Sequence, residues 1–129
     1  MDLREITGWS DDQDRGRELR LRDPVTGRAT GIVFRIAGPD SATQRRAQLR
    51  LVDDLAEMAG PDGRVSAEHR ERARLDCLAR CVLGWDIRED GEPVPFTHRN
   101  VVRVLGAARW LQEQVDAFAA DRAAFRGER

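Results

Sequence analysis

The chain has 129 residues, enough for one domain with a modest hydrophobic core and too few for a second independent domain. Its charges nearly cancel, at a net −1 with 35% charged residues, which argues against a general nucleic-acid binder. Every basic residue is Arg, which we attribute to the codon bias of a GC-rich genome and not to phosphate recognition. No apolar run approaches the roughly 18 residues that span a bilayer, and the N-terminus does not resemble a signal peptide, so we expect a cytoplasmic protein without membrane contact.

The N-terminal third predicts an arm and a hairpin. Residues 1–16 are expected to form a flexible N-terminal arm, because residues 11–17 are almost wholly charged or Gly. For Trp9 in this arm, packing on its own domain is favoured over a role as a partner anchor. Residues 17–37 predict a β-hairpin whose turn opens at Asp23-Pro24 and closes at Gly27. Since a two-stranded hairpin is barely stable alone, it must lie on the helices or gain a strand from a partner.

Three helical segments follow, at about residues 41–59, 66–83 and 97–125, and the last has a candidate interruption near Gly106. Their N-termini are expected to be capped by Asp40 or Ser41, by Ser66 and by Thr97. The pattern predicts an α+β fold that is mostly α-helical, with an N-terminal β-hairpin followed by three or four helices. We expect one domain over residues 17–125 and a charged tail at residues 126–129.

The connector between the second and third helical segments predicts a structural corner. Its residues are Trp85, Asp86, Gly91, Pro93, Pro95, Phe96, Thr97 and Asn100. Gly91 can adopt a positive φ, and each proline favours extended geometry in the residue before it. Trp85 and Phe96 stand at the two ends of the connector and are expected to pin it to the helices by burying apolar surface.

No constellation of residues indicates catalysis, a cofactor or a metal ion. Cys77 and Cys81 lie four apart on one helical face, but no further ligands follow at a suitable spacing, so we expect buried, reduced structural thiols. His69 and His98 have no nucleophile at a suitable place, and the acids of residues 89–92 are expected to form a solvated turn. No phosphate-binding glycine motif occurs. We therefore expect a protein that is not an enzyme.

The corner also carries a resemblance to a known family. Leu83-Gly84-Trp85-Asp86, the run from Asp90 to Thr97, Asn100-Val101 and Trp110-Leu111 with Gln114 resemble the tail assembly chaperone family of long-tailed bacteriophages and prophages. The hairpin and the Gly38-Pro39-Asp40-Ser41 stretch are similar to the N-terminal part of such proteins, so the resemblance covers roughly residues 18 to 125. It implies a non-enzymatic helper in the host bacterial cytoplasm that binds the tape measure protein and is absent from the mature virion. Tail tube subunits are a second candidate partner.

A helper for a long, helical and largely apolar client needs an apolar groove. The candidate partner-binding residues lie in the last helical segment and are Val101, Val104, Trp110, Leu111, Val115 and Phe118. Self-association along this segment is a further expectation. The alternative is that these residues form the core, and Trp110 and Phe118 are then the ones favoured to reach a partner. Two other function classes stay open: a structural virion protein of the tail or connector, and a small helical regulatory or nucleic-acid-binding protein.

Overall fold

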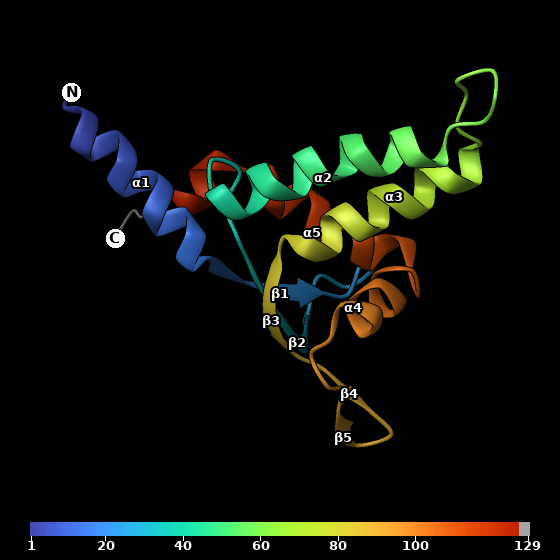
Figure 1. Cartoon of the computed structure of the whole chain (residues 1–129). Helices are drawn as coiled ribbons and strands as arrows, with labels where there is room; N and C mark the ends of the chain where they lie inside the picture. Colours follow the sequence, from blue (N-terminus) through green and yellow to red (C-terminus); the bar gives the residue numbers. More distant parts are fainter. Residues whose placement is uncertain (127–129) are drawn as a thin grey trace.

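The computed structural model describes residues 1–126, which have an α+β fold that is mostly helical. The helices are α1 (Leu3–Arg15), α2 (Ala42–Met58), α3 (Ala67–Arg80), α4 (His98–Leu105) and α5 (Arg109–Ala119), followed by the short 3₁₀ helix η1 (Arg122–Phe125). The strands are β1 (Arg17–Arg22), β2 (Ala29–Ile36), β3 (Val82–Asp86), β4 (Arg88–Glu89) and β5 (Glu92–Pro93). Figure 1 shows α2 and α3 side by side above the sheet, α1 extending to one side and the β4–β5 ribbon projecting below. Of the predicted charged tail, residues 127–129 lie outside the described residues.

The predicted hairpin is confirmed and gains a third strand from the same chain. Strands β1 and β2 pair antiparallel, with Leu19 opposite Phe34. The Asp23 carboxylate accepts hydrogen bonds from the backbone N–H groups of residues 25 and 26, as expected of an Asp that opens a turn. Strand β3 then pairs antiparallel with the other edge of β2, with Trp85 opposite Phe34, in the order β1-β2-β3. The support that the hairpin needs therefore comes from β3 and the helices.

The prediction of the second helix, at residues 66–83, is wrong at its C-terminal end. Helix α3 stops at Arg80, and residues 82–86 form β3 instead of continuing the helix. The backbone N–H of Ala37 donates to the carbonyl of Cys81 at 2.9 Å, where the chain leaves the helix and joins the sheet. The free edge of β2 offers unpaired backbone groups, and Val82 and Gly84 both have weaker helix propensity than the residues before them. Residues 82–86 are therefore more stable as a strand paired with β2 than as a continuation of α3.

The last predicted helical segment is divided as its sequence suggested. Helix α4 ends at Leu105, Gly106 caps it, and α5 begins three residues later at Arg109. The Thr97 hydroxyl caps α4 by accepting from the N–H of Asn100 at 3.1 Å. Ser41 and Ser66 cap α2 and α3 in the same way. The predicted caps are therefore confirmed, with Ser41 in place of Asp40 for α2.

Helix α1 overturns the prediction of a flexible arm at residues 1–16. Its first turn is closed by a capping box: the Asp2 side chain accepts from the N–H of Arg4 at 2.8 Å, and the Glu5 side chain accepts from the N–H of Asp2 at 2.8 Å. At the other end, the Asp14 carboxylate accepts from the backbone N–H of Thr43 at 2.9 Å and so caps α2 from outside. The capping box at one end of α1 and the hydrogen bond to α2 at the other stabilise the helix despite the many charged residues on which the prediction of a flexible arm was based.

The main core lies between the sheet and helices α3, α4 and α5. Its larger buried side chains are Leu21, Phe34, Ile36, Leu78, Val82, Val101, Val104, Leu105, Leu111, Val115 and Phe125. A second, smaller cluster joins α2 to α3 through Ala47, Cys77 and Cys81. Within residues 1–126, none of the helices combines the length and apolarity needed to cross a bilayer.

Candidate functional site

Four of the six predicted partner-binding residues are buried in the main core. Val101, Val104, Leu111 and Val115 are each exposed by 7% or less. The sheet and α3 cover this face of α4 and α5, so the four side chains hold the domain together and do not line an exposed groove. That part of the prediction is wrong, and the alternative assignment of these residues to the core holds.

Trp110 and Phe118 lie at the margin of the core and are half-buried. The Phe118 ring packs on Phe125 with their centroids 5.1 Å apart. Its remaining surface lines a shallow hollow together with Leu19 and Ala117. These two aromatic residues therefore keep some accessible surface, but they lie apart from the deeper groove described below.

The predicted corner forms around Trp85, at the junction of β3 and the β4–β5 ribbon. The indole N–H of Trp85 donates to the carbonyl of Val94 at 2.9 Å. Its ring meets Phe34 and Phe96 edge-on, with centroid distances of 5.7 and 5.6 Å. The Asn100 amide donates to the Pro95 carbonyl at 2.9 Å and closes the corner onto α4.

The rest of the corner is a turn at the surface. Gly91 has a φ of 81°, as its place between β4 and β5 requires, and Pro93 lies in β5. Phe96 is 46% exposed, so it covers Trp85 without entering the core. Asp86 is exposed at the end of β3. Glu89 pairs with Arg103 of α4 at 3.1 Å, so the acidic turn is tied to the helix.

Gln114, the last residue of the sequence stretch that resembles the tail assembly chaperone family, connects α5 to β1. Its side-chain amide donates to the carbonyl of Arg22 at 2.8 Å and its carbonyl oxygen accepts from the N–H of the same residue at 3.0 Å. These two bonds occupy the outer edge of β1 as a neighbouring strand would. Helix α5 is thereby fixed to the sheet.

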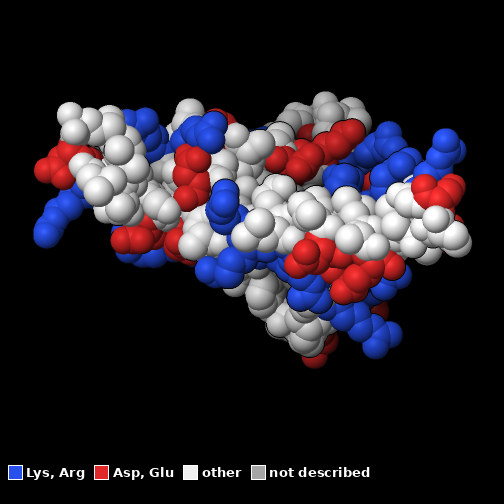
Figure 2. All heavy atoms as spheres, turned by 45° about the horizontal axis from the view of Figure 1, so that its top comes forward, with Lys and Arg blue, Asp and Glu red and all other residues white. Residues whose placement is uncertain are grey.

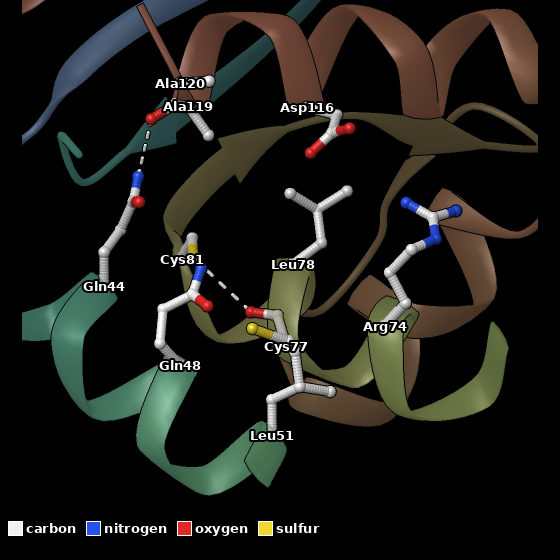
Figure 3. Close-up of a pocket in the computed structure, with 10 residues that line it drawn as sticks. All are labelled: Gln44, Gln48, Leu51, Arg74, Cys77, Leu78, Cys81, Asp116, Ala119 and Ala120. Carbon is white, nitrogen blue, oxygen red and sulfur yellow. Dashed lines mark hydrogen bonds between the residues drawn. The ribbon is translucent and has the colours of Figure 1, made fainter. Parts of the chain in front are cut away.

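An open groove lies between α2, α3 and the C-terminal end of α5 (Figure 3). Its volume is about 190 Å³. The apolar part of its lining consists of Leu51, Cys77, Leu78, Cys81, Ala119 and Ala120, and the polar part of Gln44, Gln48, Arg74 and Asp116. In Figure 3 the two glutamines stand on one side, with Arg74 and Asp116 on the other. The volume is below the roughly 300–1,000 Å³ of most cofactor pockets and suits one or two aliphatic side chains.

The two thiols at the groove are buried and neutral. Burial raises the pKa of the Cys77 thiol, and burial together with the neighbouring Cys77 raises that of Cys81 to about 12. The Cys77 thiol donates to the carbonyl of Ala47, and that of Cys81 to the carbonyl of Cys77, each at 3.4 Å. Since nucleophilic attack and metal binding need the thiolate, these residues act here as small apolar side chains. In the described residues, 1–126, no cluster of three or more His, Cys, Asp or Glu side chains is placed to hold a metal ion.

The polar ends of the groove are held in place by their own contacts. The buried Gln44 amide donates to the carbonyls of Ala37 and Ala119, each at 2.8 Å, and so joins α2 to the end of α5. At the opposite end, the Arg74 guanidinium binds the Glu71 carboxylate at 2.9 Å, and this hydrogen bond raises the pKa of Arg74. A groove with fixed walls loses little conformational entropy when it is filled.

The sequence contained one signal for this groove that the pattern analysis missed. Gln44 and Gln48 lie four residues apart on the same side of α2 as Ala47 and Leu51. Polar residues in an otherwise apolar stripe indicate a place where the helix is not sealed against its neighbours. In comparisons with protein-family models, curated proteins and solved structures, no match to this chain was found.

Proposed function

We propose that this chain is a non-enzymatic tail assembly chaperone that binds the tape measure protein in the host bacterial cytoplasm during tail morphogenesis and leaves before the virion is complete. Tail tube subunits are a second proposed partner. The observation that carries the proposal is where the residues of the resemblance lie. Trp85 makes the joint between β3 and the corner, and Gln114 makes the joint between α5 and β1. Two residues of the resemblance thus join separate elements of this fold, as expected if the resemblance reflects a shared architecture.

The groove between α2, α3 and α5 is the proposed client site. A helical client presents apolar side chains at intervals of three and four residues, and one or two of these fit beside Leu51, Leu78 and the thiols. The polar flanks of such a helix would meet Gln48 and Asp116 at the exposed rim. One aliphatic side chain contributes about 1.5–3 kcal/mol on burial, so a single groove binds weakly. Weak binding suits a helper that must release its client.

The proposal is tested by co-expressing the tagged chain with the tape measure protein of the same tail gene cluster and purifying both the complex and the finished particles. We expect the two proteins to co-purify from the cell extract and the chain to be missing from the particles. If the chain instead remains in purified particles in fixed stoichiometry, it is a structural virion component. If it binds nucleic acid in a salt-sensitive manner and no tail protein, it belongs to the regulatory class.

A further inference from the structure

The outward face of α2 carries apolar side chains that no other part of residues 1–126 covers. Leu49 is 55% exposed and Val52 is 64% exposed. Ala56 follows at a helical spacing and is also exposed, so the three form one stripe. Ala47 lies on the opposite side of the helix and is 2% exposed, because that side packs on α3.

Charges beside this stripe are segregated along the helix. Arg45 and Arg46 lie in the N-terminal half, and Asp53 and Glu57 lie in the C-terminal half. Such an order opposes the helix dipole, which favours acids near the N-terminus and bases near the C-terminus. Within the described part of the chain, none of these four residues forms an ion pair. The Asp14 carboxylate of α1 offsets part of this cost at the N-terminal half, where it caps α2 and lies near Arg46. Asp53 and Glu57 have no such partner in the described residues, which points to a second copy that brings a basic group to them.

We propose that this face is a homodimer interface in which α2 packs antiparallel on α2 of a second copy, across a two-fold axis between Leu49 and Val52. Two-fold symmetry makes each half of the helix meet the other half of its copy. Leu49 then packs on Val52 of the second copy, and Val52 packs on Leu49 of the second copy. Arg46 and the acids lie on the same flank of the stripe, so Arg46 meets Asp53 and Glu57 of the second copy.

The surface argues for a second copy over a partner of one charge sign. Figure 2, which brings the upper side of the molecule forward, shows acidic and basic groups interleaved with uncharged areas. A nucleic acid attracted to Arg45 and Arg46 would be repelled by the acids two turns further along. An antiparallel second copy instead brings Arg46 of each helix to Asp53 and Glu57 of the other. A hollow beside Leu49, lined also by Pro39 and Gln48, leaves room for an apolar side chain of the second copy.

The dimer should be weak and sensitive to salt. Helix α2 has 17 residues and is therefore about 25 Å long. A single pair of such helices buries less than the roughly 1,200 Å² of stable interfaces, so we expect a dissociation constant of about 10–100 μM. Gln44 and Gln48 line both the groove and the hollow beside Leu49, so the dimer face adjoins the groove along the N-terminal half of α2. The inference rests on the exposed stripe and the charges beside it and does not depend on the proposed function.

The test is sedimentation equilibrium at low salt with two charge variants, Arg46→Glu and the double change Asp53→Arg with Glu57→Arg. Each variant places like charges across its own interface, so each should dimerise at least tenfold more weakly than the wild type. Mixed one to one, the two variants place opposite charges across the interface and should recover the wild-type affinity. Arg72→Glu, an equal charge change at an exposed site of α3, should leave dimerisation unchanged.

Two outcomes would overturn the proposal. One is a wild-type protein that stays monomeric at several hundred micromolar, and the other is a mixture of variants that pairs no better than either variant alone. Because Arg46 also lies near Asp14 of α1, circular dichroism must show that each variant is folded. The variant changed at residues 53 and 57 lies away from α1 and keeps the test valid if Arg46→Glu disturbs that helix. A monomer that still binds the tape measure protein overturns only the dimer.

Discussion

The indole nitrogen of Trp85 lies 2.9 Å from the carbonyl oxygen of Val94 and donates a hydrogen bond to it. This bond joins the end of β3 to the segment that leads into α4. Phe34 and Phe96 enclose the indole ring from two directions, so a single residue holds the sheet, the ribbon and the helix start together.

Replacing Trp85 with Ala should therefore destabilise the protein by about 3 kcal/mol, the lower end of the range for large aromatic truncations, because the ring is only half-buried. Trp85→Phe keeps an aromatic ring at this position but loses the indole N–H and part of the ring volume, so it should cost about 1–2 kcal/mol. Urea unfolding followed by circular dichroism measures both variants. Equal stability of the wild type and Trp85→Ala would show that the corner is not a structural joint.

Gln114 should contribute through its two bonds to Arg22. Removing the amide in Gln114→Ala leaves both backbone groups of the β1 edge to water, and we expect a loss of about 1–2 kcal/mol. Glu113→Ala on the same helix, at an exposed position, is the matched control and should cost less than about 0.5 kcal/mol. Since Ala has a higher helix propensity than Gln or Glu, equal losses in both variants would mean that the bonds to Arg22 contribute no stability of their own.

Docking of α1 should be lost in acid. Burial alone would raise the pKa of the Asp14 carboxyl, but hydrogen bonds from Thr43 and Ala42 outweigh it and lower the pKa below 3.8. A hydrogen bond from Arg122 likewise holds the pKa of Asp40 below 3.8. A carboxyl group whose pKa is lower in the folded state stabilises the protein fully at a pH above its pKa in the unfolded chain. This stabilisation is lost as the pH falls through its pKa in the folded state. Helix α1 should therefore loosen as the pH falls below about 4.

The Trp9 indole is a suitable reporter for this transition, because the Arg126 guanidinium lies 3.8 Å from its ring centroid. Its indole N–H signal in nuclear magnetic resonance should shift toward the position of an unfolded peptide between about pH 4 and pH 2. The double variant Asp14→Asn with Asp40→Asn should show the loosened signal already at neutral pH. An unchanged Trp9 signal in that variant would mean that the two carboxylates do not hold α1.

The cysteines should resist thiol reagents in the folded protein. With the pKa of Cys81 at about 12, almost none of that thiol is ionised at pH 8, and burial limits access to both. We expect labelling with a disulfide reagent at pH 8 to be at least about 100-fold slower in the native state than in urea. Rapid labelling of either residue in the native state would show that the groove opens deeply enough to expose its floor.

Much of the fold could be predicted from interactions between residues that are close together in the sequence. The Asp23 turn of the hairpin and the Ser41, Ser66 and Thr97 caps are set by residues within a few positions of one another, and each was predictable. Helix α1 had an equally local signal in its capping box, but the acidic run that follows obscured it. Its docking depends on Asp14 meeting Thr43, which no spacing rule reveals.

The elements that could not be predicted depend on contacts between residues far apart in the sequence. Val82 to Asp86 become a strand only because β2, some fifty residues earlier, has an edge to fill. The apolar repeat of Val101, Val104, Leu111 and Val115 suits a groove and a core equally well, and only the packing of the sheet against it distinguishes the two. The groove between α2, α3 and α5 forms because α5 ends beside α2, where Gln44 donates a hydrogen bond to the carbonyl of Ala119.

The proposed chaperone role is tested by measuring the solubility of the tape measure protein when it is co-expressed with three forms of this chain. Ala120→Arg places a long charged side chain in the proposed client groove, directly after α5, and Ala117→Arg places one on α5 outside that groove. We predict that the wild type and Ala117→Arg keep the tape measure protein soluble and co-purify with it, and that Ala120→Arg does neither while remaining folded. If the tape measure protein is equally insoluble with and without the wild-type chain, the chaperone assignment is contradicted.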